Sequence, residues 1–166
     1  MNIITWNILG LNIPHKTKIL TRKIQTERLV VICVQETKCS EHRLLETWRK
    51  AWRNYEGVGI YAYREVWGLV ILCNPEKISL AGFLSSQTSL LVEFHVVGTS
   101  IRGVMTNVYG PHTTTQKVGF IKTLWKINQG VEGRHWILGG YFNMITSLEG
   151  KKGRRRRMDG EIVIFR

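Results

Sequence analysis

The apolar run Leu29-Val-Val-Ile-Cys-Val34 leads directly into the polar residues Gln35-Glu36-Thr37. Continuous apolar residues rich in Val and Ile are typical of a strand that is buried on both faces of a sheet. An amphipathic helix is predicted on either side of this run, over residues 16–28 and from Ser40 to about Arg53. Strands and helices that alternate in this way predict an α/β domain with helices outside its sheets.

The rest of the sequence up to residue 149 adds further elements and contains neither a repeat nor a linker. A first strand is predicted over residues 2–7, a third helix over residues 114–129, and a last short strand that ends at Gly139-Gly140. Between them, apolar segments recur about every ten residues, which predicts antiparallel hairpins. We therefore expect mixed sheets in one domain over residues 1–150, followed by a basic loop or tail over residues 151–166. The strands expected in the middle of the chain cover residues 57–61, 66–73, 78–83, 90–97 and 101–108.

The chain is strongly basic, with 24 Lys and Arg residues against 12 acidic residues in 166, and a net charge of +12. A broadly basic surface favours a polyanionic partner such as nucleic acid, and the alternative is an incidental basic balance. Eleven of the acidic residues are Glu, and Asp159 is the single Asp. Because Asp is a frequent ligand of hard metal ions, a metal-dependent enzyme with so few Asp residues is unusual.

The cysteines and apolar runs bear on location. Cys33, Cys39 and Cys73 are odd in number and have no metal-like spacing, which argues against a disulfide framework and favours reduced thiols in an intracellular protein. No apolar run approaches the ~20 residues that cross a bilayer, and residues 1–7 lack the basic start of a secretory signal. We therefore expect no secretion and no membrane partner, with the nucleus as one candidate location.

Four polar clusters follow predicted strands, and side chains at strand ends are held rigidly where they can form a site. Each cluster alone has a structural explanation, because an Asn at a strand end is commonly a turn residue and Gly139-Gly140 could be only a tight turn. Tyr109 could likewise serve packing. An acid that follows a buried strand, such as Glu36, usually needs a partner or a cation. The clusters are Trp6-Asn7, Gln35-Glu36-Thr37, Asn107-Val-Tyr109-Gly-Pro111 and Gly139-Gly-Tyr-Phe-Asn143.

Taken in order, the four clusters resemble the endonuclease/exonuclease/phosphatase family, and within it the endonuclease domain of plant non-LTR retrotransposons (long interspersed elements). The resemblance covers essentially the whole chain. It implies a four-layer α/β sandwich of two packed mixed sheets with helices outside, and Mg²⁺-dependent cleavage of phosphodiester bonds in DNA. It rests on I-I-T-W-N-I-L-G-L-N at residues 3–12, V-Q-E-T-K-C-S at 34–40, T-N-V-Y-G-P at 106–111 and H-W-I-L-G-G-Y-F-N-M-I at 135–145.

The resemblance also implies a role for each motif. Asn7 and Glu36 would lie beside Mg²⁺, with Glu36 as its direct ligand. Tyr109 would hydrogen-bond the scissile phosphate, and Asn143 would stabilise it. The family's G-D-x-N motif falls at residues 140–143, where its Asp would orient or deprotonate the attacking water. Mg²⁺ prefers oxygen ligands and neutralises charge in the transition state. No small-molecule cofactor is implied, and the oligomeric state is left open.

Two departures from the family pattern bear on catalysis. Tyr141 stands at the motif position of the Asp, and a phenol is bulkier and a poor base at neutral pH. The sequence ends at Arg166, whereas the resemblance implies further strands that carry a terminal Asp-His pair. All five histidines precede the place of that pair, and His112, beside Pro111, is the nearest to the predicted site. We therefore expect a C-terminally truncated copy whose catalysis is impaired.

The basic tail is a candidate for nucleic-acid contact through phosphate groups. Its alternatives are a targeting signal and a solvated loop. For the whole chain, three hypotheses stay open at this stage: an impaired Mg²⁺-dependent endonuclease domain, a non-catalytic basic remnant that binds nucleic acid, and a translated relic with no selected function. The candidate contact residues are Lys151, Lys152, Arg154, Arg155, Arg156 and Arg157.

Overall fold

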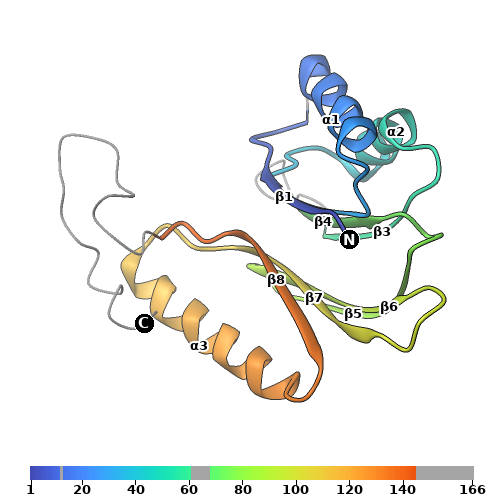
Figure 1. Ribbon diagram of the computed structural model, residues 1–166. Helices are drawn as coiled ribbons and strands as arrows, with labels where there is room; N and C mark the ends of the chain where they lie inside the picture. The colour runs from blue at the N-terminus through green and yellow to red at the C-terminus, as the bar shows by residue number, and fades with distance from the viewer. Residues whose placement is uncertain (12, 61–67, 145–166) are drawn as a thin grey trace.

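The computed structural model describes residues 1–11, 13–60 and 68–144. Figure 1 shows α1 and α2 over one sheet, a second sheet packed beneath it, and α3 on the far face of the second sheet. This order is the four-layer α/β sandwich of two mixed sheets that the family resemblance implied, and it confirms the α/β class predicted from the residues. Along the described residues the elements are β1 (Ile3–Asn7), α1 (Pro14–Thr26), β2 (Val31–Gln35), α2 (Glu41–Ala51), β3 (Glu56–Ile60), β4 (Leu69–Cys73), β5 (Ile78–Ser85), β6 (Ser89–Val96), β7 (Arg102–Tyr109), α3 (Thr114–Gly130) and β8 (His135–Tyr141).

Each sheet combines antiparallel hairpins with one parallel pair. The first sheet has the strand order β1-β2-β4-β3, and the second has the order β5-β6-β7-β8. The hairpins expected in the middle of the chain are present, since β3 pairs antiparallel with β4, β5 with β6, and β6 with β7. The parallel pairs are β1 with β2 and β7 with β8, and a helix connects each of them, as parallel pairing requires.

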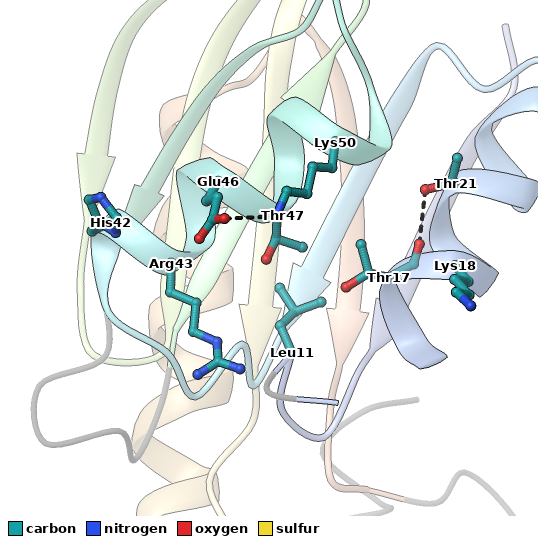
Figure 2. Close-up of a pocket in the computed structure, with 9 residues that line it drawn as sticks. All are labelled: Leu11, Thr17, Lys18, Thr21, His42, Arg43, Glu46, Thr47 and Lys50. Carbon is teal, nitrogen blue, oxygen red and sulfur yellow. Dashed lines mark hydrogen bonds and ion pairs between the residues drawn. The ribbon is translucent and has the colours of Figure 1, made fainter. Parts of the chain in front are cut away.

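Helices α1 and α2 lie side by side on the outer face of the first sheet. Figure 2 shows the sides that they turn toward each other, where the Glu46 and Lys50 side chains of α2 form an ion pair at 2.7 Å. On α1, the Thr21 hydroxyl donates to the Thr17 carbonyl at 3.0 Å. The two helices therefore leave polar and charged side chains along their junction, above the apolar layer that holds them to the sheet.

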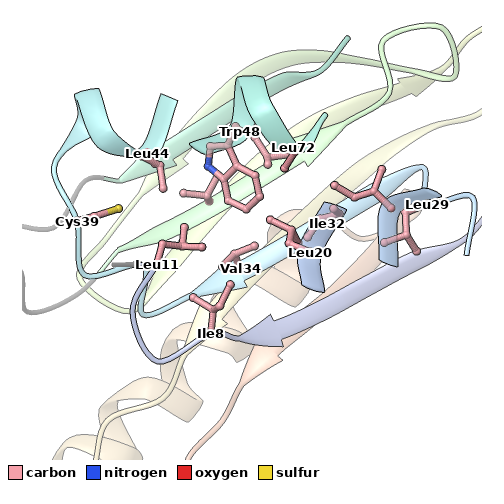
Figure 3. Close-up of a cluster of buried hydrophobic side chains, with 13 residues drawn as sticks. Ile8, Leu11, Leu20, Leu29, Ile32, Val34, Cys39, Leu44, Trp48 and Leu72 are labelled. Atoms are coloured by element: carbon pink, nitrogen blue, oxygen red, sulfur yellow. The ribbon is translucent and has the colours of Figure 1, made fainter. Parts of the chain in front are cut away.

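Strand β2 is buried along its whole length, as its apolar sequence predicted. Alternate side chains point to opposite faces of a strand, so Ile32 and Val34 pack with the helices while Val31 and Cys33 pack against the second sheet. Figure 3 shows the helix-facing layer, in which Trp48 of α2 and Leu20 of α1 cover the strands. Burial also raises the pKa of the Cys33 thiol to about 12, which fits an inert core cysteine.

The last described strand differs from the sequence prediction, which ended it at Gly139-Gly140. Strand β8 continues through both glycines to Tyr141, and it pairs Gly140 with Val108 of β7. Gly140 has a φ of +145°, and a Cβ there would lie 2.1 Å from the Val108 carbonyl oxygen. Gly140 therefore serves a close approach between strands rather than a turn, and the strand carries Tyr141 to the end of β8, opposite Tyr109.

Membrane insertion through a helix finds no support in this part of the chain. Among residues 1–11, 13–60 and 68–144, no helix combines the length and the apolar character that a bilayer crossing needs.

Candidate functional site

The sequence-predicted site residues come together where the two parallel strand pairs end. Asn7 at the end of β1 lies opposite Gln35 at the end of β2, so Glu36 follows at the same edge of the first sheet. In the second sheet, Tyr109 at the end of β7 lies opposite Tyr141 at the end of β8. Because β2 packs against β7 across the sandwich, these strand ends form one polar group of side chains.

Glu36 is the centre of this group and is only 7% exposed. Its Oε1 accepts a hydrogen bond from the Asn7 amide at 2.8 Å and another from the Tyr109 hydroxyl at 2.8 Å. Its Oε2 forms an ion pair with the Lys38 ammonium at 2.7 Å. The buried acid thus has the partners that its burial requires, and it links β1, β2 and β7.

The backbone around Glu36 holds the carboxylate in place. Glu36 and Lys38 both adopt left-handed conformations, with φ of 54° and 47°. Residues 8–11 pair with this segment, since the amides of Gly10 and Leu11 donate to the carbonyls of Glu36 and Thr37 at 2.7 and 2.8 Å. Positive φ is uncommon in residues with a side chain and collects at functional sites. This turn brings Lys38 back onto Glu36.

The partners of Glu36 determine its charge state. Burial by itself raises the pKa of the Glu36 carboxyl. Hydrogen bonds from Lys38, Asn7 and Tyr109 lower it, and so does the positive charge of Lys38. Together they outweigh burial, so the pKa of Glu36 lies below the usual range for Glu. Burial, with the hydrogen bond to Glu36 and its negative charge, raises the pKa of Tyr109 to about 12. At neutral pH the site therefore presents a carboxylate and a phenol that keeps its proton as a donor.

Three further side chains surround Tyr109. The Tyr141 ring stacks on the Tyr109 ring with centroids 5.9 Å apart and planes 25° apart. The Nε2 of His112 lies 3.0 Å from the Tyr109 hydroxyl oxygen. Since that hydroxyl gives its hydrogen to Glu36, the contact requires a hydrogen on His112 Nε2. Asn143 lies beside them, and its amide donates to the Gly110 carbonyl.

A buried amide pair supports the site from below. The Gln35 amide donates to Asn107 Oδ1 at 2.6 Å, across the interface between the two sheets. The Asn107 amide donates to the carbonyls of Val34 and Val70 at 2.9 and 3.0 Å. Asn107 is fully buried, so these bonds replace the water that its side chain gives up. This pair fixes the distance between the strand ends that carry Glu36 and Tyr109.

The family resemblance implies Mg²⁺ at this site, and the oxygen atoms near Glu36 decide whether it can be held there. Glu36 offers a carboxylate, but both of its oxygens have partners, and Lys38 would have to move aside for a cation. Within the described residues, no three His, Cys, Asp or Glu side chains gather as a metal-binding group. Mg²⁺ often takes only one or two carboxylates and completes its shell with water and substrate phosphate. The carboxylate of Glu36 is thus an oxygen donor of the kind that Mg²⁺ prefers, but a cation there would have to displace Lys38 from Oε2.

Sequence reasoning missed two members of this group. The sequence motifs assign no role to Lys38, which lies in V-Q-E-T-K-C-S, or to His112, which follows Pro111. The spacing Tyr109-Gly-Pro-His112 is a signal for His112, because a turn after β7 returns that side chain to the tyrosine. The predicted nucleic-acid contacts from Lys151 to Arg157 lie outside the described residues, so their role stays a prediction.

The lowered pKa of Glu36 makes stability depend on pH in a stated direction. Because the folded chain holds the proton less tightly than the unfolded chain, the carboxylate stabilises the fold above the unfolded pKa of about 4.3, and that contribution is lost as pH falls through the lower folded pKa. Urea unfolding between about pH 7 and pH 3 should therefore show the wild type converging on Glu36→Gln as the solution becomes acidic. The exposed Glu132→Gln is the matched charge control. A stability difference that stays constant with pH would contradict the geometry at Glu36.

Comparison with known proteins places this geometry in a family. Residues 4–157 match the Endonuclease/Exonuclease/phosphatase family. A family protein from Bacteroides thetaiotaomicron has a similar structure, with a TM-score of 0.71 and 13% identity over 85% of this chain and 62% of that chain. A mannosyl-6-phosphatase from the same organism gives a TM-score of 0.71 at 14% identity, over 86% of this chain and 65% of that chain.

A third similar structure is TDP2 from D. rerio in complex with a single-strand DNA product. It gives a TM-score of 0.65 at 16% identity, over 86% of this chain and 60% of that chain. The chain thus spans less than two thirds of the length of these three structures. No curated protein matches the sequence.

Identity this low shows a shared fold, and the family match adds the evidence of sequence over nearly the whole chain. The family match agrees with the family that the sequence resembled, and the structural likeness agrees with the four-layer sandwich. The chain belongs to the endonuclease/exonuclease/phosphatase family.

Proposed function

We propose that this chain is a DNA-directed endonuclease domain of the plant non-LTR retrotransposon type, in which Mg²⁺-dependent hydrolysis is impaired while DNA binding is kept. The observation that carries the proposal is the group at the strand ends. Asn7 and Tyr109 donate to the carboxylate of Glu36, Asn143 donates to the carbonyl of Gly110 beside Tyr109, and the aromatic ring of Tyr141 stands where the family motif has its Asp. The retrotransposon type rests on the four motifs and their order.

The residues that remain can bind and orient a phosphodiester. Mg²⁺, when held at Glu36, would polarise a phosphoryl oxygen and neutralise its developing charge. Tyr109 keeps its proton, because its pKa is raised to about 12, and could give its hydrogen bond to a phosphate oxygen in place of Glu36. The amides of Asn7 and Asn143 supply further donors close by. Lys38, 40% exposed at its side chain, can leave Glu36 for the same phosphate.

Water activation is the step for which the motif carboxylate is missing, since Tyr141 stands at its position. A general base must lie within hydrogen-bond reach of the water and accept its proton near neutral pH. Tyr141 replaces the motif carboxylate with a ring that packs on Tyr109. Glu36 has a lowered pKa and its two oxygens already have three partners, so it is a poor proton acceptor. We therefore infer weak or absent hydrolysis and retained binding.

The strong positive charge supports DNA as the partner, with a net charge of +12 spread over the chain and concentrated beyond residue 150. Binding through phosphates releases counterions, so affinity should fall steeply with salt, with a slope near 0.9 per phosphate contact. The alternative, a non-catalytic nucleic-acid-binding remnant, makes the same binding prediction. The two hypotheses differ at Glu36. An impaired endonuclease domain requires a Mg²⁺ site there, and a non-catalytic binding remnant requires none.

The test combines binding and cleavage on one supercoiled plasmid. We expect binding that weakens with salt, and nicking that stays at background with Mg²⁺ or with chelator. Mn²⁺ binding, followed by electron paramagnetic resonance, should be detectable in the wild type and lost in Glu36→Gln, with Glu132→Gln as the matched control. Absence of any DNA binding would overturn the proposal, and equal Mn²⁺ binding by Glu36→Gln would favour the remnant.

A further inference from the structure

An open groove lies between α1 and α2, on the opposite side of the first sheet from the sheet-sheet interface. Its volume is about 660 Å³. Lys18 of α1 and Arg43 of α2 are among the residues that line it. Figure 2 shows Arg43 extending from α2 and Thr17 pointing from α1 toward Leu11, which lies between the two helices. Thr17 and Thr47 add hydroxyl groups to its wall. This surface is separate from the group around Glu36.

The groove carries excess positive charge. Its acidic side chain, Glu46, pairs with Lys50 at 2.7 Å, so that acid and that base offset each other. Lys18 and Arg43 also line the groove, so its lining residues comprise three Lys or Arg side chains and one acid, and the positive charge of Arg43 also acts on Glu46. Helix α1 strengthens the field, because its sequence PHKTKILTRKIQT contains four Lys and Arg residues and no acid. An anionic ligand is therefore favoured over a neutral one.

The groove begins beside the candidate site. Leu11 lines it, and the Leu11 amide donates to the carbonyl of Thr37, the residue after Glu36, at 2.8 Å. The neighbouring Gly10 approaches Lys38, whose Cβ would lie 3.7 Å from a Cβ built at position 10. Leu11 therefore joins the segment around Glu36 to the groove, which starts at the same edge of the first sheet.

We propose that the groove between α1 and α2 binds the phosphodiester backbone of the nucleic-acid strand that extends from the Glu36 site. This inference rests on the proposed function. Lysine, arginine and threonine are the side chains that commonly contact phosphate oxygens and position a protein along a strand. Backbone contacts of this kind carry no sequence information, so the groove adds affinity and register to the site. An acidic peptide is the alternative occupant.

The test compares two double variants that remove the same charge. Lys18→Ala/Arg43→Ala removes two of the three Lys and Arg side chains that line the groove and leaves the Glu46–Lys50 pair in place. Lys122→Ala/Lys126→Ala removes two exposed lysines of α3 on the far side of the sandwich. Binding of a fluorescent duplex of about 20 base pairs is followed by anisotropy in chelator, as a function of salt. Loss of two phosphate contacts should lower the magnitude of the salt slope by about 1.8 and weaken binding about tenfold at low salt. The α3 variant should keep the wild-type slope.

Each other outcome is decisive. If both variants lost the same DNA affinity and salt slope, the effect would come from overall charge, and the proposal for the groove would be wrong. Loss of poly-glutamate binding with unchanged DNA binding would assign the groove to an acidic peptide. If the wild type fails to bind DNA, the proposed function fails first, and the two failures are thereby distinguished. The charge-conserving Lys18→Arg/Arg43→Lys variant should bind like the wild type, and thermal melts of all variants exclude misfolding as the cause.

Discussion

Replacing Asn107 with alanine is expected to lower the free energy of unfolding by about 3 kcal/mol. Asn107 is fully buried and accepts from Gln35 at 2.6 Å, while its amide donates to Val34 and Val70 carbonyls. Alanine removes all three hydrogen bonds and opens a small cavity. The Gln35 amide keeps its contacts with the Thr5 hydroxyl and the Cys33 carbonyl, whereas the buried Val34 and Val70 carbonyls lose the Asn107 donor, and such a loss costs about 1–3 kcal/mol. Urea unfolding followed by far-UV circular dichroism measures the difference.

Two comparisons separate the hydrogen bonds from the loss of side-chain volume. Asn128→Ala, at an exposed position of α3, removes the same atoms from the surface and should change stability by less than about 0.5 kcal/mol. Gln35→Leu combined with Asn107→Leu replaces both partners by apolar groups, and should cost less than Asn107→Ala alone. A loss below about 1 kcal/mol in Asn107→Ala would show that the amide pair does not join the sheets.

This amide pair illustrates which features a sequence can predict. The run from Leu29 to Val34 predicts a doubly buried strand, because burial on both faces leaves a continuous apolar pattern. Polar residues directly after such strands predict where a site lies. The pairing of Gln35 with Asn107, 72 residues apart, depends on how two sheets stack, and no local pattern records it.

Two local features, at Gly140 and Lys38, could not be predicted because they depend on backbone geometry. Gly139-Gly140 has the composition of a turn, yet the structure uses Gly140 for the close approach of β8 to β7. Lys38 follows Glu36 by two residues, a spacing that would place their side chains on the same face of an extended strand. Their ion pair instead forms where both residues adopt left-handed backbone conformations, and no sequence pattern predicts those conformations.

Repair of the catalytic group is expected to give the largest change in activity. The purified chain and its Tyr141→Asp variant should both leave plasmid DNA intact with Mg²⁺. The same Tyr141→Asp chain, joined to the C-terminal segment of an intact family member, should nick it. The reason is that Tyr141 stands at the position of the motif carboxylate, and that the chain spans less than two thirds of the length of its structural relatives. General-base catalysis is worth about 10²–10⁴-fold in rate, and a second charge-stabilising group about 10²–10³-fold, so restoring one alone leaves the rate near background.

The fused protein also allows the role of Glu36 to be read directly. Glu36→Gln in the repaired protein should abolish nicking and Mn²⁺ binding together, because Glu36 supplies the carboxylate of the described site. Tyr141→Phe in the fused protein keeps an aromatic ring without a carboxylate and should remain inactive, which separates the gain of an acid from relief of crowding beside Tyr109. Nicking by the unmodified chain that Glu36→Gln removes would show that Tyr141 is tolerated and that hydrolysis is intact. Nicking that survives Glu36→Gln in the repaired protein would place the metal elsewhere and remove Glu36 from the proposed site.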